Sequence, residues 1–468
     1  MSKATPSAQG TLWGHPKGLF LLFSTELWER FSYYGMRALL VLYLTAQTTA
    51  GGLGWTQADA LKLYGIYTGL VYITPLIGGW LADTFLGQRR AIILGAIMMA
   101  AGQFTLALPH AMFPDMVNQV FYIGLGLLIA GNGMFKPNIS TMVGDLYEQG
   151  DHRRDGAFTI FYMGINLGAL LAGFVAGAVA TEWGWQAGFV AAGIGMLFSL
   201  VIQTFFAQRY LGDIGKVPAA KRSAALRSTT QKAPLTKQEV DRIKVILVMG
   251  LFTIIFWAGF EQAGGLMNLY TENYTDRMIG SFEVPTAWFQ SLNPFFIITL
   301  APVVAAIWVK LGQREPSSPV KFAMGLGFLA LGFLFMIGAV LEQGGDTSVK
   351  TSMFWLVGAF LFHTLGELCL SPIGLSMVTK LAPLRLASLM MGAWFGFVAL
   401  ANYAAGMIGS FVGEAGPMAI FGGIAITAII CAAILLAFAN KLIYWMHGAE
   451  GHAEEPQHTA DDVVVTSH

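Results

Sequence analysis

The sequence predicts an all-α polytopic membrane protein whose twelve transmembrane helices form two halves of six helices each. Its composition is the first observation, since 55% of the 468 residues are hydrophobic, only 12% are charged and 56 are glycine. These values are typical of chains that cross a bilayer many times. The second observation is a series of apolar runs that reach the roughly 20 residues needed to span a bilayer. The runs cover residues 18–45, 60–82, 90–109, 117–140, 157–179, 186–207, 243–271, 287–310, 321–341, 351–380, 387–412 and 417–445.

A polar stretch over residues 208–242 separates the first six runs from the last six. It is rich in Lys, Arg, Ala and Thr, so we interpret it as a linker on the cytoplasmic side. We therefore expect an N-terminal six-helix half over 1–207 and a C-terminal six-helix half over 243–446. Residues 447–468 are expected to form a disordered cytoplasmic tail.

The loops carry their basic residues mainly on one side of the membrane. When the loops are assigned alternately to two sides, one side holds only Lys62, Arg277 and Lys350. Cytoplasmic loops carry an excess of Lys and Arg, so we expect the other side, with both termini, to face the cytoplasm. We expect the protein to lie in the inner membrane of the cell. The polar first 16 residues do not resemble a cleaved signal peptide.

Charged residues inside the first apolar run indicate a polar cavity. An unpaired charge within a bilayer is costly, and at about 100° per residue the charged residues and two tyrosines of this run share one helix face. That face cannot contact lipid. Its members are Glu26, Glu29, Arg30, Tyr33, Tyr34 and Arg37.

Three further ionisable residues lie in other apolar runs. They are Lys136 in the fourth run, Glu261 in the seventh and Glu367 in the tenth. Helices 1, 4, 7 and 10 hold equivalent positions in a repeated three-helix block, so we expect them to face one central cavity. If all seven residues are charged, the cavity carries one surplus negative charge that a proton, a cation or a substrate amine could neutralise. For any single acid, a structural ion pair is an equally good interpretation.

A repeated loop sequence indicates that the two halves arose by duplication. Leu86-Gly87-Gln88-Arg89-Arg90 follows the second run, and Leu311-Gly312-Gln313-Arg314-Glu315 follows the second run of the other half. Such a repeat predicts two six-helix units related by an axis along the membrane normal. Gly78-Gly79-Trp80-Leu81-Ala82-Asp83 resembles the short loop signature of the major facilitator superfamily, which implies a fold and not a substrate.

Longer motifs resemble the proton-coupled oligopeptide transporter family. Glu26-x-x-Glu29-Arg30-Phe31-x-Tyr33-Tyr34-Gly35 is similar to its helix 1 signature, and Phe161-Tyr162-x-x-Ile165-Asn166-x-Gly168 to its helix 5 signature. Further similar motifs are Gly133-x-x-Lys136-Pro137-Asn138, Phe256-Trp257-x-x-Phe260-Glu261-Gln262, Gly366-Glu367-x-x-x-Ser371-Pro372-x-Gly374 and Met391-Gly392-x-Trp394. The chain has no room for the two extra helices that many bacterial members carry between the halves. The resemblance implies symport of dipeptides and tripeptides with protons, by alternating access around a central charged cavity.

The resemblance also implies a site that holds both ends of a zwitterionic peptide. Arg37 and Lys136 would bind the carboxylate, for which a planar guanidinium is well suited, and Glu367 with Asn166 would bind the amine. Fixed charges at both ends accept few backbone lengths at about 3.5 Å per residue, so free amino acids and tetrapeptides should compete poorly. The other expected peptide-binding residues are Tyr33, Tyr34, Tyr162, Trp257, Ser371, Trp394 and one of Tyr67 or Tyr72, of which Tyr72 is preferred for its spacing from Asp83.

For energy coupling we assign Glu26, Glu29 and Arg30 to a proton site, where Arg30 holds one acid ionised while the other exchanges a proton. Glu261 is a further proton-coupling residue. Two ion pairs between the halves, Arg37 with Glu261 and Lys136 with Glu367, are expected to act as gates when the cavity is closed on one side. Pro137, Pro294 and Pro372 are expected to interrupt helices 4, 8 and 10.

Other functions are weighed against peptide symport. A proton-coupled carrier of another small solute, such as nitrate or a peptide-like drug, stays open, although Glu367 argues against nitrate. An exporter of lipophilic drugs would seldom keep seven paired charges. We expect no enzyme, no metal site, no cofactor beyond the proton as coupling ion and no nucleic-acid partner. We also expect a monomer in the lipid bilayer, with Cys369, Cys431 and His363 as packing residues.

Overall fold

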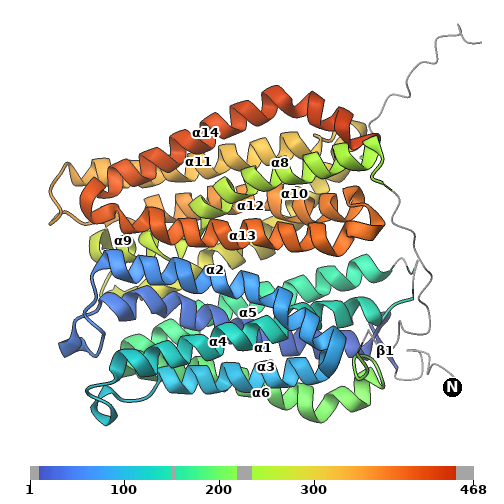
Figure 1. The fold of residues 1–468 in the computed structure, drawn as a ribbon. Coiled ribbons are helices and arrows are strands. Elements are labelled where there is room, and N and C mark those ends of the chain that lie inside the picture. The colour runs from blue at the N-terminus through green and yellow to red at the C-terminus, as the bar shows by residue number, and fades with distance from the viewer. Residues whose placement is uncertain (1–9, 149–150, 152, 219–233, 450–468) are drawn as a thin grey trace, which may run out of the picture.

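The computed structural model describes residues 10–148, 151, 153–218 and 234–449, and these form two helical bundles that lie side by side (Figure 1). The first bundle contains α1 (Lys17–Thr45), α2 (Gln57–Leu81), α3 (Gln88–Leu106), α4 (Val117–Asp145), α5 (Arg153–Trp183) and α6 (Trp185–Leu211). The second contains α8 (Lys237–Phe260), α9 (Leu266–Tyr274), α10 (Leu292–Leu311), α11 (Ser318–Gln343), α12 (Met353–Leu381), α13 (Ala387–Ser410) and α14 (Val412–Met446). One apolar core, made of buried residues from the helices of both bundles, continues through the described structure.

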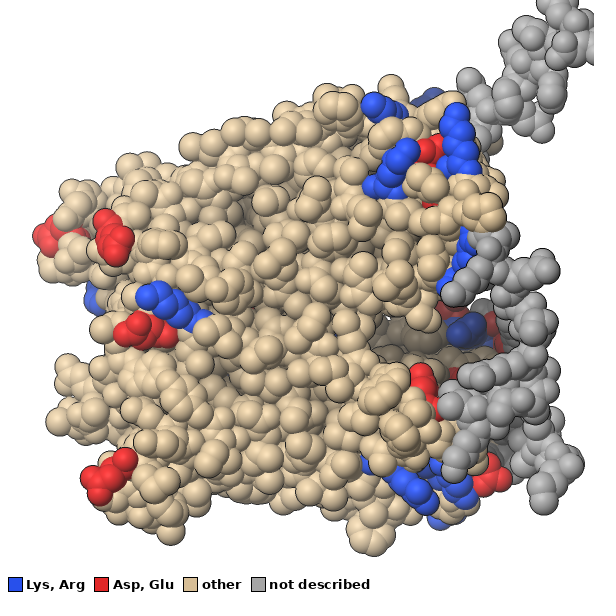
Figure 2. Space-filling view, viewed as in Figure 1, with Lys and Arg blue, Asp and Glu red and all other residues tan. Residues whose placement is uncertain are grey.

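Within the described part of the chain, ten helical segments are long and apolar enough to cross a membrane. The segments of α1 and α3 complete the six spans of the first bundle. They are less apolar because α1 contains four charged residues and α3 begins next to Arg89 and Arg90. Both helices pack inside the bundle, α1 against α5 and α6, and α3 against α4. Figure 2 shows the resulting surface, on which charged side chains gather at the two ends and leave a broad uncharged band between them.

Local sequence determines where several helices begin. At α8, the Thr236 side chain accepts a hydrogen bond from the Glu239 amide at 3.2 Å, and the Glu239 carboxylate accepts one from the Thr236 amide at 2.8 Å. This capping box satisfies two amides that would otherwise have no partner. Residues 219–233 of the expected linker and 450–468 of the expected tail lie outside the described residues, while 208–211 belong to α6 and 237–242 to α8. The division of the chain at 208–242 stays a prediction.

The seventh span is broken where the sequence suggested one continuous run. α8 ends at Phe260, a 3₁₀ turn (η5) covers Glu261–Ala263, and α9 begins at Leu266 after the non-helical Gly265. The eighth span begins with another 3₁₀ turn (η6, Thr286–Ser291) that leads into α10.

The expected interruptions at three prolines are not present as chain breaks. Pro137 and Pro372 lie within the continuous helices α4 and α12, and Pro294 lies in the first turn of α10. A proline in the first turn removes no intrahelical hydrogen bond, and inside a transmembrane helix neighbouring groups can satisfy the carbonyl that it leaves free.

The two bundles meet where α2 packs against α13 (Figure 1), where α5 packs against η6 and α10, and where α1 contacts α9. Gly65 of α2 and Gly406 of α13 allow the first pair to approach closely. A Cβ atom on Gly65 would lie 2.8 Å from the Cα atom of Gly406, so a larger residue would force the helices apart.

Short strands lie only at the ends of the described bundles. β1 (Thr11–Leu12) pairs with β2 (His15–Pro16) and β4 (Met278–Ile279) with β5 (Phe282–Glu283), both antiparallel, while β3 (Thr275–Asp276) runs parallel to β6 (Thr351–Ser352). The first hairpin is held by a hydrogen bond of 2.8 Å between His15 Nδ1 and the Tyr147 hydroxyl. Burial raises the pKa of Tyr147 to about 12, so this hydroxyl keeps its proton at neutral pH.

Candidate functional site

The first part of the site is a buried cluster of charges on α1. Arg30 lies between two acids: its Nε atom is 3.0 Å from Glu26 Oε1, and its Nη2 atom donates to Glu29 Oε1 at 2.8 Å. Arg30 Nε also donates to the second oxygen of Glu29, and Asn132 of α4 donates to Glu29 at 3.0 Å. Both oxygens of Glu29 therefore have partners, whereas Glu26 Oε2 has no hydrogen-bond partner within the described structure. The two acids are held unequally.

The second part joins the two bundles through Arg37 and Glu261. Arg37 Nη2 lies 2.5 Å from Glu261 Oε2, so the structure contains this ion pair between the halves. The Tyr64 hydroxyl completes a triangle, because it accepts from Arg37 Nε at 2.9 Å and donates to Glu261 at 3.1 Å. Gly264, which follows the turn at Glu261–Ala263, leaves room for this group, because a Cβ atom there would lie 2.8 Å from Arg37 Nη2.

Two tyrosines connect these groups along α1. The Arg30 guanidinium lies 5.3 Å from the Tyr33 ring centroid, and the Arg37 guanidinium lies 5.6 Å from that of Tyr34. The two rings make an edge contact with 5.1 Å between their centroids. A continuous series of cation–π, ring and ion-pair contacts thus runs from the α1 acids to Glu261.

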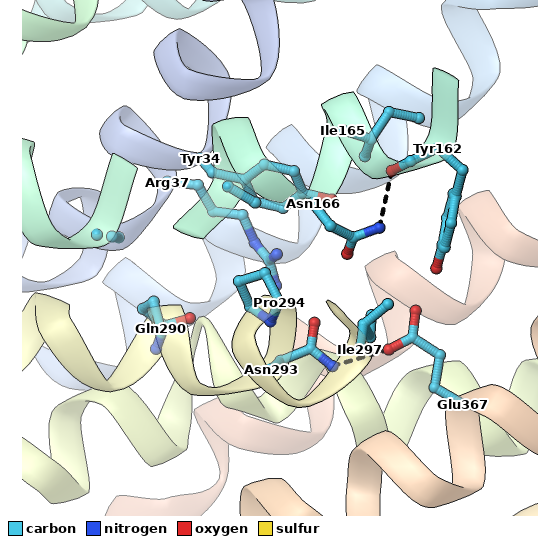
Figure 3. Close-up of a pocket in the computed structure, with 13 residues that line it drawn as sticks. Tyr34, Arg37, Tyr162, Ile165, Asn166, Gln290, Asn293, Pro294, Ile297 and Glu367 are labelled. Carbon is cyan, nitrogen blue, oxygen red and sulfur yellow. Dashed lines mark hydrogen bonds between the residues drawn. The ribbon is translucent and has the colours of Figure 1, made fainter. Parts of the chain in front are cut away.

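A cavity of about 90 Å³ lies between the bundles, and polar groups of both line it (Figure 3). Tyr34 and Arg37 come from α1, and Glu367 comes from α12 on the opposite side of the cavity. The Tyr162 hydroxyl of α5 points toward the Glu367 carboxylate, and Asn293 of α10 donates to that carboxylate at 2.8 Å (Figure 3).

Asn166 also lines the cavity and donates to the carbonyl of Tyr162 at 3.0 Å, which leaves the amide oxygen of Asn166 directed toward the open space (Figure 3). A cation from one half and a carboxylate from the other therefore face one chamber.

The chamber extends toward one end of the molecule. A second cavity of about 570 Å³ shares Tyr162, Asn166 and Glu367 with the first and is also lined by Ser371. It reaches Lys321, which lies near the same end as the start of α1. At this end, which carries most of the Lys and Arg side chains, the surface is hollowed between the bundles (Figure 2).

The opposite end is held shut by contacts between the halves in addition to the Arg37–Glu261 pair. Asn268 donates to the Ala38 carbonyl at 2.9 Å, and Ser291 donates to the Leu170 carbonyl at 2.8 Å. The Trp288 indole donates to the Phe174 carbonyl at 3.0 Å. The cavity is therefore closed on one side and open on the other.

Comparison with known proteins identifies the family of this architecture. The sequence model of the POT family matches residues 89–211 and 214–420. The chain belongs to the POT family. It is 38% identical to the peptide transporter YePEPT of Yersinia enterocolitica subsp. palearctica, over 96% of this chain and 99% of that protein. It is also 38% identical to a di-/tripeptide transporter of Lactococcus lactis subsp. cremoris, over 82% of this chain and 87% of that protein.

A solved POT structure confirms the fold. A mutant of the peptide transporter POT, crystallised in complex with alafosfalin, superposes with a TM-score of 0.87 at 37% identity, covering 95% of this chain and 98% of that one. The POT chain described here thus has the twelve-helix fold of the major facilitator superfamily in two halves, as the sequence predicts.

One expected ion pair of this POT chain is not formed. Lys136 and Glu367 do not contact each other; the Lys136 ammonium lies 4.1 Å from the Tyr72 ring centroid, and Glu367 is hydrogen-bonded to Asn293. The physical reason is that each group has a nearby partner in its own half, Tyr72 of α2 for Lys136 and Asn293 of α10 for Glu367. Tyr72 contacts Lys136 and does not line the 90 Å³ cavity.

The two tryptophans expected to bind peptide pack against aromatic rings of the C-terminal half, and their role in peptide binding stays a prediction. Trp257 packs against Phe256 and Phe260 on its own helix, with ring centroids 5.4 and 5.0 Å apart. Trp394 is only 5% exposed and packs over Gly374 and Phe322. Neither lines the two cavities described above, because both rings are held in aromatic packing inside the C-terminal half.

Sequence reasoning missed three polar partners. Asn132 holds Glu29, Tyr64 bridges Arg37 and Glu261, and Asn293 holds Glu367. Tyr64 lies eight residues before Tyr72 and so on the same face of α2. This spacing is the one feature of the sequence that could have indicated Tyr64 as a site residue. His363 is buried against Phe333 at 4.7 Å between ring centroids, in line with a packing role.

Proposed function

We propose that this protein is a symporter that uses the proton gradient to carry dipeptides and tripeptides into the cell. The observation that carries the proposal is the placement of Arg37 and Glu367 on opposite sides of one cavity, one from each half. A short peptide has a carboxylate at one end and an ammonium at the other, so a cavity with these two charges matches both ends. The names of the two relatives, a peptide transporter and a di-/tripeptide transporter, support the same substrate class.

The polar groups around each charge would fix the peptide ends. Arg37 would bind the carboxylate, and Glu367 would bind the ammonium with Tyr162 and Asn166 beside it. The larger cavity next to Glu367 is lined mainly by apolar side chains, so it would accept peptide side chains with little selectivity. Lys136 stays a candidate for the carboxylate in a state where the open side closes.

Proton coupling would act through two acids. Glu26, with one oxygen free of partners in the described structure, is the acid of the α1 cluster that would exchange a proton, while Arg30 and Asn132 donate hydrogen bonds to Glu29. At the closed side, a proton on Glu261 or the peptide carboxylate at Arg37 would compete with the ion pair that joins the halves. The proton and the peptide would each bind more tightly when that side is open than when it is closed, and would therefore favour the open state.

The protein would lie in the inner membrane of the cell. Lys and Arg side chains gather at the hollowed end (Figure 2), so this end and both termini would face the cytoplasm. The chain would act as a monomer, with the proton as coupling ion and with no metal or enzymatic step.

Uptake into proteoliposomes tests the proposal. The purified protein is reconstituted, a labelled dipeptide is added outside, and uptake is measured with and without an inward proton gradient. Accumulation above the outside concentration is expected only with the gradient. Unlabelled dipeptides and tripeptides should reduce the uptake, and free amino acids and tetrapeptides should have little effect. Uptake that merely equilibrates under both conditions, or equal competition by tetrapeptides, would contradict the proposal.

A carrier of a peptide-like drug is the second candidate, and the related POT structure with alafosfalin favours it. Inhibition of dipeptide uptake by alafosfalin would show that the same site accepts such a compound.

A further inference from the structure

A groove on the outer surface of the C-terminal bundle is not used by the proposed transport cycle. It lies between α8 and α14 and has a volume of about 270 Å³. Its apolar lining includes Val248 and Phe252 from α8 and Ile434 and Phe438 from α14. Ile434 is 44% exposed and Phe438 is 53% exposed, so the groove opens toward the hydrocarbon of the bilayer and not toward the central cavity.

Basic side chains from both helices stand at one end of this groove. The Lys244 ammonium of α8 and the Lys441 ammonium of α14 lie 5.5 and 5.0 Å from the ring centroid of Trp445, which together with Lys441 lines the groove. Lys244 is 3.0 Å from Asp241, whereas no described carboxylate lies within ion-pair distance of Lys441. Arg242 also lies here and donates to the Met446 carbonyl at 3.1 Å.

Among the described residues at this end, the charges do not cancel. Asp241 is the acid in contact with the group, and it is shared between Lys244 and His447, whose Nε2 atom is 3.2 Å away. Three basic side chains of α8 and α14 therefore face one carboxylate. Figure 2 shows Lys and Arg side chains gathered where these two helices end.

We propose that the groove binds an anionic glycerophospholipid. The lipid phosphate would lie between Lys244 and Lys441, its headgroup would contact the Trp445 indole, and one acyl chain would lie along the apolar lining. Basic pockets between helices near a membrane surface are suited to anionic lipid headgroups, and tryptophan is favoured at the level of the headgroups. In the proposed orientation the lipid belongs to the cytoplasmic leaflet. This inference does not depend on the transported substrate.

Lipid binding to the purified full-length protein tests the inference. Native mass spectrometry in detergent would compare phosphatidylglycerol with phosphatidylcholine of the same acyl chains. Phosphatidylglycerol should bind more tightly. Lys441→Gln should weaken its binding about fivefold and the double variant Lys244→Gln, Lys441→Gln about 30-fold, from about 1 kcal/mol for each lysine near the phosphate. Lys310→Gln is the matched control, because Lys310 is an exposed lysine at the same end of the molecule, on α10, and should have no effect.

Two further measurements separate a lipid site from a site for the phosphate charge alone. Glycerol phosphate has the charge without the chain, so it should fail to displace the bound lipid. Val248→Phe should fill the groove and weaken lipid binding with both lysines in place. Equal binding of the two lipids, an equal loss in Lys310→Gln, or displacement by glycerol phosphate would overturn the proposal. Dipeptide uptake by the lysine variants serves as the test that they are folded.

Discussion

At the scale of single residues, the structure distinguishes acids that the sequence places together. Glu26 and Glu29 both contact Arg30. Arg30 donates hydrogen bonds to both oxygens of Glu29, and Asn132 donates a further one to the same carboxylate. Glu26 keeps one oxygen without a partner in the described structure, so a proton can be added there without breaking a hydrogen bond. We therefore assign proton exchange to Glu26 and a structural role to Glu29.

Glu26→Gln is expected to remove accumulation driven by the proton gradient and to keep exchange of labelled for unlabelled dipeptide across the membrane. The amide mimics the protonated acid and cannot release a proton. Both activities are measured in the same proteoliposome preparation. Continued accumulation against a concentration gradient would show that the proton site lies elsewhere.

Glu29→Gln tests the structural half of the same assignment. It removes the charge that accepts from Arg30 and Asn132, and a hydrogen bond to a charged group contributes about 1.5–3 kcal/mol. We expect this variant to unfold at a lower temperature in detergent than Glu26→Gln. An equal or smaller loss of thermal stability would argue against the unequal roles.

Tyr64→Phe should weaken the closed side of the cavity. The hydroxyl bridges Arg37 and Glu261, and its loss removes two hydrogen bonds to charged groups. A cysteine placed in α9 should then react faster with a water-soluble maleimide, in a background without Cys369 and Cys431. Tyr67→Phe is the matched control, because Tyr67 is equally buried in α2 and has no described hydrogen bond to the pair. Unchanged labelling in Tyr64→Phe would contradict the bridging role.

Glu367→Gln should remove the preference for a free peptide amine. The amide can still accept the hydrogen bond from Asn293, so the local packing is kept while the charge is lost. Affinity for a dipeptide should fall about tenfold or more, as expected for a hydrogen bond between charged groups, while an N-acetylated dipeptide should be little affected. Competition assays with the two compounds measure the ratio. An undiminished preference for the free amine would place its binding site elsewhere.

At the scale of elements, the break between α8 and α9 positions the gate. Gly264 lies in this break, and any other residue there would place a Cβ atom against Arg37 and Tyr64. Gly264→Ala should therefore displace the Arg37–Glu261 pair and reduce dipeptide uptake several-fold. Gly327→Ala in α11 is the control, since a Cβ atom there would meet nothing within 4 Å. Equal uptake by the two variants would show that the close approach at Gly264 is not needed.

The elements also show which features the sequence could predict. The apolar runs predicted the spans, and helical periodicity placed the charges of α1 on one face, because both depend on residues close together in the chain. The break at Glu261 was not predictable in this way, since the run 243–271 is apolar on both sides of it. Tyr64, Asn132 and Asn293 were missed because each is brought to its acid by a different helix. The packing of Trp257 and Trp394 was not predictable from the motif resemblance, because a motif does not determine the direction of a side chain.

At the scale of the whole molecule, the two bundles meet at one end and separate at the other. Contacts between the halves, including Arg37 with Glu261 and Asn268 with the Ala38 carbonyl, lie at the closed end. Lys136 and Glu367 do not pair, and each has a separate partner in its own half. The central claim is that the halves rock around the shared cavity, so that the first pair opens when the second pair closes.

The most direct test of this claim is a distance measurement across the open side. Spin labels on exposed positions of α4 and α12, such as Thr141 and Leu375, would report the separation of the halves in the reconstituted protein free of native cysteines. With a dipeptide and an acidic exterior, a population with a shorter distance should appear, and Lys136→Gln should reduce it. A single unchanged distance under all conditions, in a protein that still transports the dipeptide, would contradict the rocking of the two halves.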